Sequence, residues 1–94
     1  MQSSIPGLLE TSAKQGKLPH IEGRQIKAAR VLLGWSQIEL CQFAKIGPPT
    51  LIKLEREAGV PKRSSTAAVV ETFRQAGVIF INDGVTIGVL LAKT

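Results

Sequence analysis

The stretch at residues 35–55 constrains this chain most, because several independent signals in it mark the same helix start. Ser36 is a favoured N-cap, since its hydroxyl can accept a hydrogen bond from a free N–H group of the first turn. Glu39, three residues later, can accept a hydrogen bond from the Ser36 N–H, which completes a capping box. Trp35 before the cap and Leu40 after it have the spacing of a hydrophobic staple. Together these signals predict a helix that begins directly after the cap.

Apolar residues at the helical period predict four helices between residues 21 and 77. Their expected ranges are 23–33, 37–44, 48–57 and 66–76. Gly34 and Gly77 are expected to end the first and the fourth helix, because glycine adopts the left-handed conformation without steric cost. Ser65 is the expected N-cap of the fourth helix. The sequence therefore predicts a mainly helical domain.

The same periodicity predicts which side chains form the core. The expected inward positions are Ile26, Ala29, Leu33, Leu40, Cys41, Ala44, Leu51, Leu54, Ala58, Val69, Val70, Phe73 and Ala76. Ile46, in the turn at residues 45–47, is expected to fill the space between the second and third helices. Pro48 is tolerated at the first position of the third helix, where its missing N–H would have had no helical acceptor.

The pattern changes on both sides of the helical segment. Residues 78–81 and 85–91 are rich in β-branched and apolar side chains, and the intervening Asn-Asp-Gly is a turn signal, so residues 78–94 are expected to form a β-hairpin. Two strands alone are marginally stable in water. The hairpin is therefore expected to pack on the helices or to pair with a second copy as a dimerisation element. Residues 1–20 show no sustained period, and we expect a flexible N-terminal arm.

The excess positive charge falls in one part of the chain. The formal net charge is +5, and residues 24–63 hold eight basic and three acidic residues, so the remainder is neutral. A polyanion-binding surface requires such a concentration of charge. A solvated basic face without a ligand is the alternative.

Few residues here could perform catalysis. The chain has one histidine, His20, and one cysteine, Cys41, and Cys41 has the position of a small buried hydrophobe. Neither a glycine-rich phosphate loop nor a metal-ligand cluster is present in the sequence. We expect a protein that is not an enzyme and that uses no cofactor or metal. No apolar run reaches the ~20 residues of a membrane span, and no signal-peptide pattern is present, so we expect a cytoplasmic protein.

The helical segment resembles the helix-turn-helix of the Cro/phage-repressor (Xre-like) family of DNA-binding regulators. The resemblance covers about residues 23–77. It rests on eleven motif positions in register: Leu33, Gly34, Ser36, Gln37, Leu40, Ala44, Ile46, Thr50, Leu51, Leu54 and Glu55. The hairpin also looks like a common C-terminal extension in small members of the family.

The resemblance implies a four-helix, lambda-repressor-like domain whose recognition helix, residues 48–57, enters the major groove with its N-terminal end first. It implies an ion pair between Arg30 and Glu55 that joins the first and third helices. The DNA-contacting positions that it implies are Gln37, Lys45, Gly47, Pro48, Pro49, Thr50, Ile52, Lys53 and Arg56. Gln37 matches a glutamine that contacts phosphate and helps to orient a base-reading residue.

Two positions depart from the family pattern. Lys45 replaces the turn glycine, so a left-handed backbone there would be strained, although the exposed lysine could add a phosphate contact. Pro48 and Pro49 have no hydrogen-bonding side chain, which leaves Thr50 and Lys53 as polar base readers and Ile52 for a thymine methyl contact. We therefore expect modest base discrimination, with affinity resting largely on the cations. These are Arg24, Lys27, Lys45, Lys53, Arg56, Lys62 and Arg63.

The expected function is sequence-specific binding of double-stranded DNA by a transcriptional regulator, with repression as the expected mode. A homodimer formed through residues 78–94 would place two half-sites about one helical turn, ~34 Å, apart. The alternative from another class is an antitoxin or adaptor that uses the same fold to bind a protein partner, with the hairpin adding to the partner's sheet. The two functions are not mutually exclusive, because an antitoxin can also bind DNA.

Overall fold

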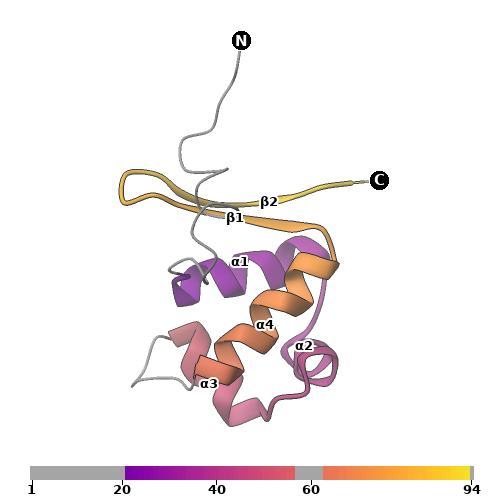
Figure 1. The fold of residues 1–94 in the computed structure, drawn as a ribbon. Coiled ribbons are helices and arrows are strands. Elements are labelled where there is room, and N and C mark those ends of the chain that lie inside the picture. Colours follow the sequence, from indigo (N-terminus) through magenta and orange to yellow (C-terminus); the bar gives the residue numbers. More distant parts are fainter. Residues whose placement is uncertain (1–20, 57–62, 94) are drawn as a thin grey trace.

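The computed structural model describes residues 21–56 and 63–93, which form four helices followed by a two-stranded antiparallel sheet (Figure 1). The elements are α1 (Gly23–Leu33), α2 (Gln37–Ala44), α3 (Pro48–Arg56), α4 (Arg63–Gln75), β1 (Val78–Asn82) and β2 (Ile87–Leu91). The predicted fold class, a mainly helical domain with a C-terminal hairpin, is confirmed. No helix in the described ranges is long and apolar enough to cross a membrane. The predicted arm at residues 1–20, the end of the third helix at residue 57 and the inward position Ala58 lie outside the described residues.

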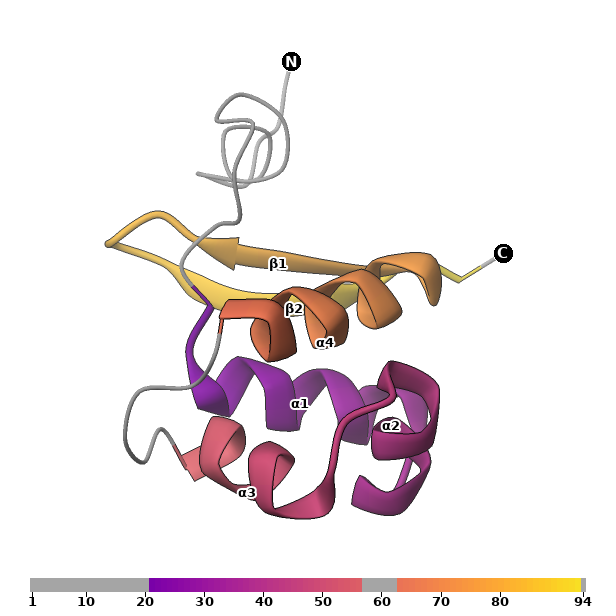
Figure 2. The same ribbon diagram turned by 60° about the horizontal axis from the view of Figure 1, so that its bottom comes forward.

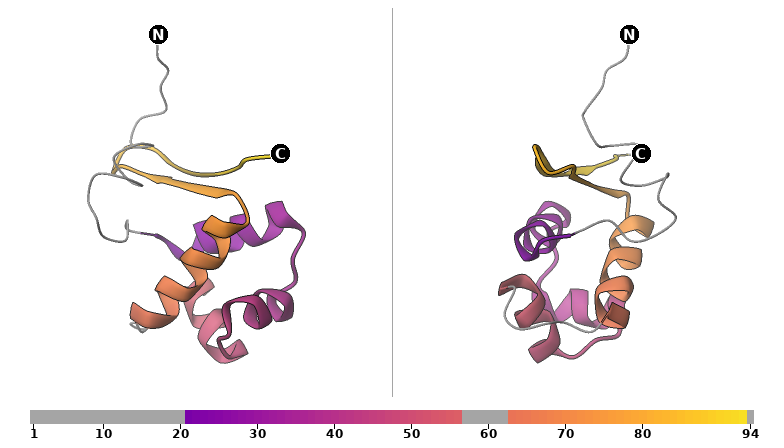
Figure 3. Two further views of the ribbon diagram at one scale, coloured as in Figure 1. Left: turned by 45° about the vertical axis from the view of Figure 1, so that its right-hand side comes forward. Right: turned by 60° about the vertical axis from the view of Figure 1, so that its left-hand side comes forward.

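The helices and the hairpin form separate layers. The hairpin lies over α1 and α4, and α2 and α3 lie on the far side of the helical layer (Figures 1 and 2). β2 packs on α1, whereas β1 packs on α4. Two further views show the hairpin as one layer at the end of the molecule away from α3 (Figure 3). This arrangement leaves the outer side of α3 uncovered by the other described elements.

The predicted core is largely confirmed. Of the described inward positions all are buried except Leu33, which is half-buried and packs against the core, and Ala76, which is half-buried and follows the end of α4. Ile46 also packs against the core, as predicted. Aromatic rings extend the core toward the hairpin: the rings of Trp35 and Phe73 stack with centroids 5.9 Å apart, and Phe73 meets Phe80 edge-on at the same distance.

A buried glutamine on α1 joins the helical layer to the hairpin. The side chain of Gln25 is almost fully buried, and its Nε2 donates to the carbonyl oxygens of Ile81 (2.9 Å) and Gly88 (3.0 Å). Its Oε1 accepts from the backbone N–H of Glu22 at 3.0 Å, which forms a capping box at the start of α1. Since Ile81 and Gly88 are cross-strand partners, one side chain holds both strands against α1.

The ranges predicted for α1 and α2 are confirmed, but the predicted start of α4 is wrong. The helix begins at Arg63, so Ser65 lies inside its first turn and is not the N-cap. The start was misplaced because two adjacent serines follow Arg63, and serine can also occupy a first turn, where the backbone N–H groups lack helical acceptors in any case. At the other end, Gly77 follows α4 with φ 95°, as a helix-ending glycine should.

The predicted boundaries of the hairpin turn are also wrong. Asn82 belongs to β1, and the loop runs over residues 83–86, so Val85 and Thr86 are not part of β2. The reason is the carboxylate of Asp83, whose Oδ1 accepts from the backbone N–H groups of Val85 (2.8 Å) and Thr86 (2.7 Å). These hydrogen bonds hold both residues in the loop, and they lower the pKa of Asp83, with the bond from Thr86 contributing most.

Candidate nucleic-acid interface

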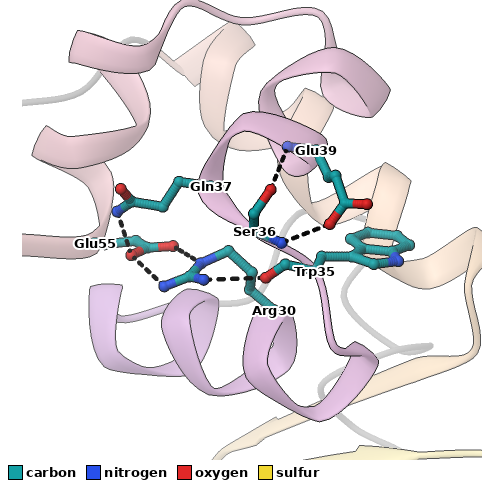
Figure 4. Close-up of polar contacts among 6 residues, drawn as sticks. All are labelled: Arg30, Trp35, Ser36, Gln37, Glu39 and Glu55. Atoms are coloured by element: carbon teal, nitrogen blue, oxygen red, sulfur yellow. Dashed lines mark hydrogen bonds and ion pairs between the residues drawn. The ribbon is translucent and has the colours of Figure 1, made fainter.

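The start of α2 is fixed by the predicted capping box. The Oγ of Ser36 accepts from the Glu39 N–H at 3.0 Å, and the Glu39 carboxylate accepts from the Ser36 N–H at 2.8 Å (Figure 4). Trp35, directly before the cap, packs against the core that contains Leu40. The chain therefore enters α2 at a defined angle, which in turn fixes where the following turn begins.

The turn between α2 and α3 has the strained backbone that the sequence predicted. Lys45 has φ 58°, and among the described residues it is the one non-glycine with positive φ. Its N–H and that of Ile46 both donate to the carbonyl of Cys41, which satisfies the end of α2. Because the turn is closed by the backbone, the side chain of Lys45 is free to extend into solvent, where it is exposed.

A polar network joins the first three helices, and it contains the ion pair that the family resemblance implies. The Nε of Arg30 on α1 donates to the Glu55 carboxylate on α3 at 2.8 Å, and the Arg30 Nη2 donates to its second oxygen at 3.3 Å. Gln37 on α2 donates from Nε2 to the same carboxylate at 3.0 Å (Figure 4). Arg30 also donates to the Trp35 carbonyl at 3.1 Å. The side chains of Arg30 and Glu55 are only 14% and 5% exposed, so the ion pair lies beneath the surface, whereas Gln37 is exposed.

The remaining predicted contact residues lie on the outside of the turn and of α3. Leu51 and Leu54 point into the core, which turns the opposite side of α3 to solvent. Thr50 is half-buried at the edge of this surface. The exposed predicted positions are Gln37, Lys45, Gly47, Pro48, Pro49, Ile52, Lys53 and Arg56. Of these, Pro49, Ile52, Lys53 and Arg56 have the i, i+3, i+4, i+7 spacing of one helical face.

The cations of this surface have no carboxylate partner within the described part of the chain. Within residues 21–56 and 63–93 the ion pairs are Arg24–Glu22, Arg30–Glu55 and Arg74–Glu71. Lys45, Lys53 and Arg56 are therefore unneutralised by the described part of the chain, and so is Lys27 on α1. Their positive charge remains available to an anion.

A hollow of about 400 Å³ adjoins the exposed side of α3. It is lined by Lys27, Arg30, Gln37, Ile52, Glu55 and Arg56, so all three of the first helices contribute to it. Lys27 was predicted among the cations that supply affinity, although it is not one of the DNA-contacting positions that the family resemblance implies. The structure brings it to the same hollow as Arg56.

Cys41 is buried on the inner side of α2, as predicted. Burial raises the pKa of its thiol, and the negative charge of Glu55 raises it further, so the thiol stays protonated and serves as part of the core. In the described part of the chain no group of three or more His, Cys, Asp or Glu side chains is arranged to hold a metal ion.

No family model matches the chain, and no curated protein matches it.

Proposed function

We propose that this protein binds double-stranded DNA through α3 and acts as a transcriptional regulator, with repression as its expected mode. The observation that carries the proposal is the network of Arg30, Gln37 and Glu55, which fixes α1, α2 and α3 relative to one another. A rigid base of this kind allows a short helix to be presented to the major groove without a cost in ordering. The resemblance of residues 23–77 to Xre-like regulators supports the same function.

The charge of the surface supports a polyanionic ligand. Lys45, Lys53 and Arg56 are exposed, lack a carboxylate partner in the described ranges and lie at the turn and along α3. Cations that neutralise DNA phosphates release bound counterions, which supplies much of the affinity and makes it depend on salt. We therefore expect binding that weakens steeply as the salt concentration rises.

The side chains on α3 limit how the bases are read. Lys53 can donate to the O6 and N7 acceptors of guanine, and Ile52 can contact a thymine methyl group. Pro48 and Pro49 are exposed at the start of α3 but offer no side-chain hydrogen bond. The half-buried Thr50 can reach a base only from the edge of the surface. The expected result is modest sequence preference on top of strong phosphate binding.

We also propose a homodimer formed through the hairpin at residues 78–94. Side chains alternate along a strand, so Ile79 and Leu90 lie on the face of the hairpin away from the core side chains Phe80 and Val89. Leu90 is 38% exposed. An apolar outer face on a two-stranded sheet is best stabilised by contact with another apolar face.

Selection of bound duplexes from a random DNA pool would test DNA binding. We expect an enriched sequence, weaker binding by Lys53→Ala and an altered preference when Thr50 is replaced by valine. Arg74→Ala is the matched control, because Arg74 is an exposed cation on α4 that pairs with Glu71. If the protein shows no preference over random duplex at moderate salt, its proposed function as a transcriptional regulator is ruled out.

A protein-binding module, such as an antitoxin or adaptor, is the second candidate. The observations that favour it are the two prolines at the start of α3 and the exposed apolar side chains Val31, Ile38 and Phe43 on α1 and α2. A partner captured by the full chain through residues 78–94, insensitive to salt and accompanied by no duplex binding, would favour this function over DNA binding.

A further inference from the structure

The hollow between α1, α2 and α3 has the chemistry of an anion site. Its lining holds three cations, Lys27, Arg30 and Arg56, but only one carboxylate, that of Glu55. The hollow therefore carries two positive charges in excess. It is also the place where α1, which holds none of the DNA-contacting positions that the family resemblance implies, comes next to the exposed side of α3.

The one carboxylate would not repel an anion strongly, because it is already compensated. Glu55 accepts from the Arg30 Nε at 2.8 Å and from the Gln37 Nε2 at 3.0 Å, and its side chain is only 5% exposed. Arg30 is used in the same pair and donates as well to the Trp35 carbonyl. Arg30 and Glu55 therefore neutralise each other, and the excess positive charge of the hollow comes from the other two cations.

Lys27 and Arg56 supply that charge from two different helices. Both side chains are exposed, and neither has an ion pair with a carboxylate in residues 21–56 or 63–93. Two cations that flank a polar hollow can bind one anion between them, and each forms a charge-assisted hydrogen bond to it.

We infer that this hollow binds a phosphate of the DNA backbone, held by Lys27 from α1 and Arg56 from α3. The inference rests on the proposed function, since it requires a duplex seated on α3 with its backbone beside Arg56. It gives α1 a direct part in binding: α1 supplies a phosphate contact in addition to its core side chains. Because a phosphate carries no sequence information, this site sets affinity and register and leaves base preference unchanged.

Binding of duplex DNA by the full-length variants Lys27→Ala and Arg56→Ala would test the site, with fluorescence anisotropy over a range of salt concentrations. We expect each substitution to weaken binding to all sequences alike and to reduce the slope of log affinity against log salt by about 1. The double variant should lose less affinity than the product of the two single losses, because both cations hold the same phosphate. Both side chains are exposed, so circular dichroism should show an unchanged fold.

Arg74→Ala is the matched control, because it removes an exposed cation on α4, outside both the hollow and the hairpin. Its salt slope should equal that of the unchanged protein. If Lys27→Ala behaves like Arg74→Ala while the unchanged protein binds DNA, the phosphate site is wrong and the proposed function stands. If the singles each weaken binding but their losses multiply in the double variant, the two cations bind separate phosphates and the shared site is wrong. If the unchanged protein binds no duplex, both proposals fail together.

Discussion

Glu55 is the residue through which the first three helices are joined. Its carboxylate accepts hydrogen bonds from Arg30 on α1 and Gln37 on α2 while it lies on α3 itself. A buried ion pair contributes little net stability relative to an apolar pair of the same size, because both charges are desolvated. Removing one partner is different, since it leaves the other charge buried without compensation.

Glu55→Gln should therefore be strongly destabilising. The Arg30 guanidinium is only 14% exposed and would lose its counter-charge, so we expect the free energy of unfolding to fall by about 2–4 kcal/mol. Urea denaturation followed by circular dichroism measures this. Glu71→Gln is the control, because Glu71 makes an exposed pair with Arg74 that should contribute little. Equal effects of the two substitutions would contradict a structural role for Glu55.

Replacing Lys45 by glycine should stabilise the fold but weaken DNA binding. A non-glycine residue at φ 58° is strained, so Lys45→Gly should raise the free energy of unfolding by about 0.5–1 kcal/mol, after the added freedom of the unfolded chain is subtracted. The same substitution removes an exposed cation at the turn and should weaken DNA binding. Lys45→Ala separates the two effects, because it removes the charge and keeps the strain. A Lys45→Gly variant that is no more stable than Lys45→Ala would show that the turn is not strained.

At the scale of the elements, one polar side chain joins both strands of the hairpin to α1. Gln25 donates to carbonyl groups of both strands and accepts from the Glu22 N–H, so all of its polar atoms are used. Gln25→Leu keeps the approximate size and removes these hydrogen bonds. We expect a loss of about 1–3 kcal/mol in the free energy of unfolding. Gln42→Leu makes the same chemical change at an exposed position on α2 and should have little effect.

The hairpin loop should weaken in acid. The pKa of Asp83 is lowered in the folded state, chiefly by the hydrogen bond from the Thr86 N–H and then by that from Val85. A lowered folded pKa means that the stabilisation is fully present above the unfolded pKa of about 3.9 and is lost as the pH falls through the folded value. Hydrogen exchange of the Thr86 amide should therefore accelerate in that range, beyond the intrinsic change with pH. Asp83→Asn keeps an acceptor oxygen that does not titrate, and it should remove this acceleration.

The sequence predicts the ends of an element correctly where the contacts that decide them lie within about one turn of the chain. The starts and ends of α1 and α2 follow from local chemistry: the Ser36–Glu39 capping box, Gly34 and the apolar spacing all act within one turn of the chain. The start of α4 was misplaced because two adjacent serines give the same local signal. The loop at residues 83–86 was misplaced because its end is decided by the Asp83 carboxylate and not by the Asn-Asp-Gly composition.

The sequence could not predict the contacts that join distant elements. Gln25 looks like an ordinary polar residue of a helix, and only the packing of the hairpin, more than fifty residues later, makes it a buried anchor. Lys27 likewise becomes part of a hollow only because α3 packs beside α1. The Arg30–Glu55 pair was anticipated through the family resemblance, since no local pattern links two residues 25 positions apart.

At the scale of the whole molecule, the hairpin and the cations of α3 lie at opposite ends. The hairpin forms the layer at one end, and α3 lies at the other end of the helical layer (Figures 1 and 3). Contact between two hairpins would therefore leave α3 of each copy uncovered. It would also keep the cations on α3 of the two copies apart, which avoids like-charge repulsion across the interface.

A dimer of this kind predicts a specific effect of Leu90→Lys. The outward side chain of Leu90 is 38% exposed, so a lysine there should leave the fold intact while it places a charge in the apolar contact. We expect the dimer dissociation constant, measured by sedimentation, to rise about tenfold or more. Val85→Lys, at a 92% exposed position in the hairpin loop, is the control and should stay dimeric.

A dimer that joins two copies of α3 should also change how tightly DNA is bound. In a dimer the second copy binds as an intramolecular step, so a duplex with two half-sites is bound more tightly than a duplex with one. Leu90→Lys should abolish this advantage and leave the affinity for a single half-site unchanged, because α3 and its cations are not altered. If Leu90→Lys weakens binding to one half-site as much as to two, the hairpin affects α3 within a single copy, and the dimer is not the form that binds DNA.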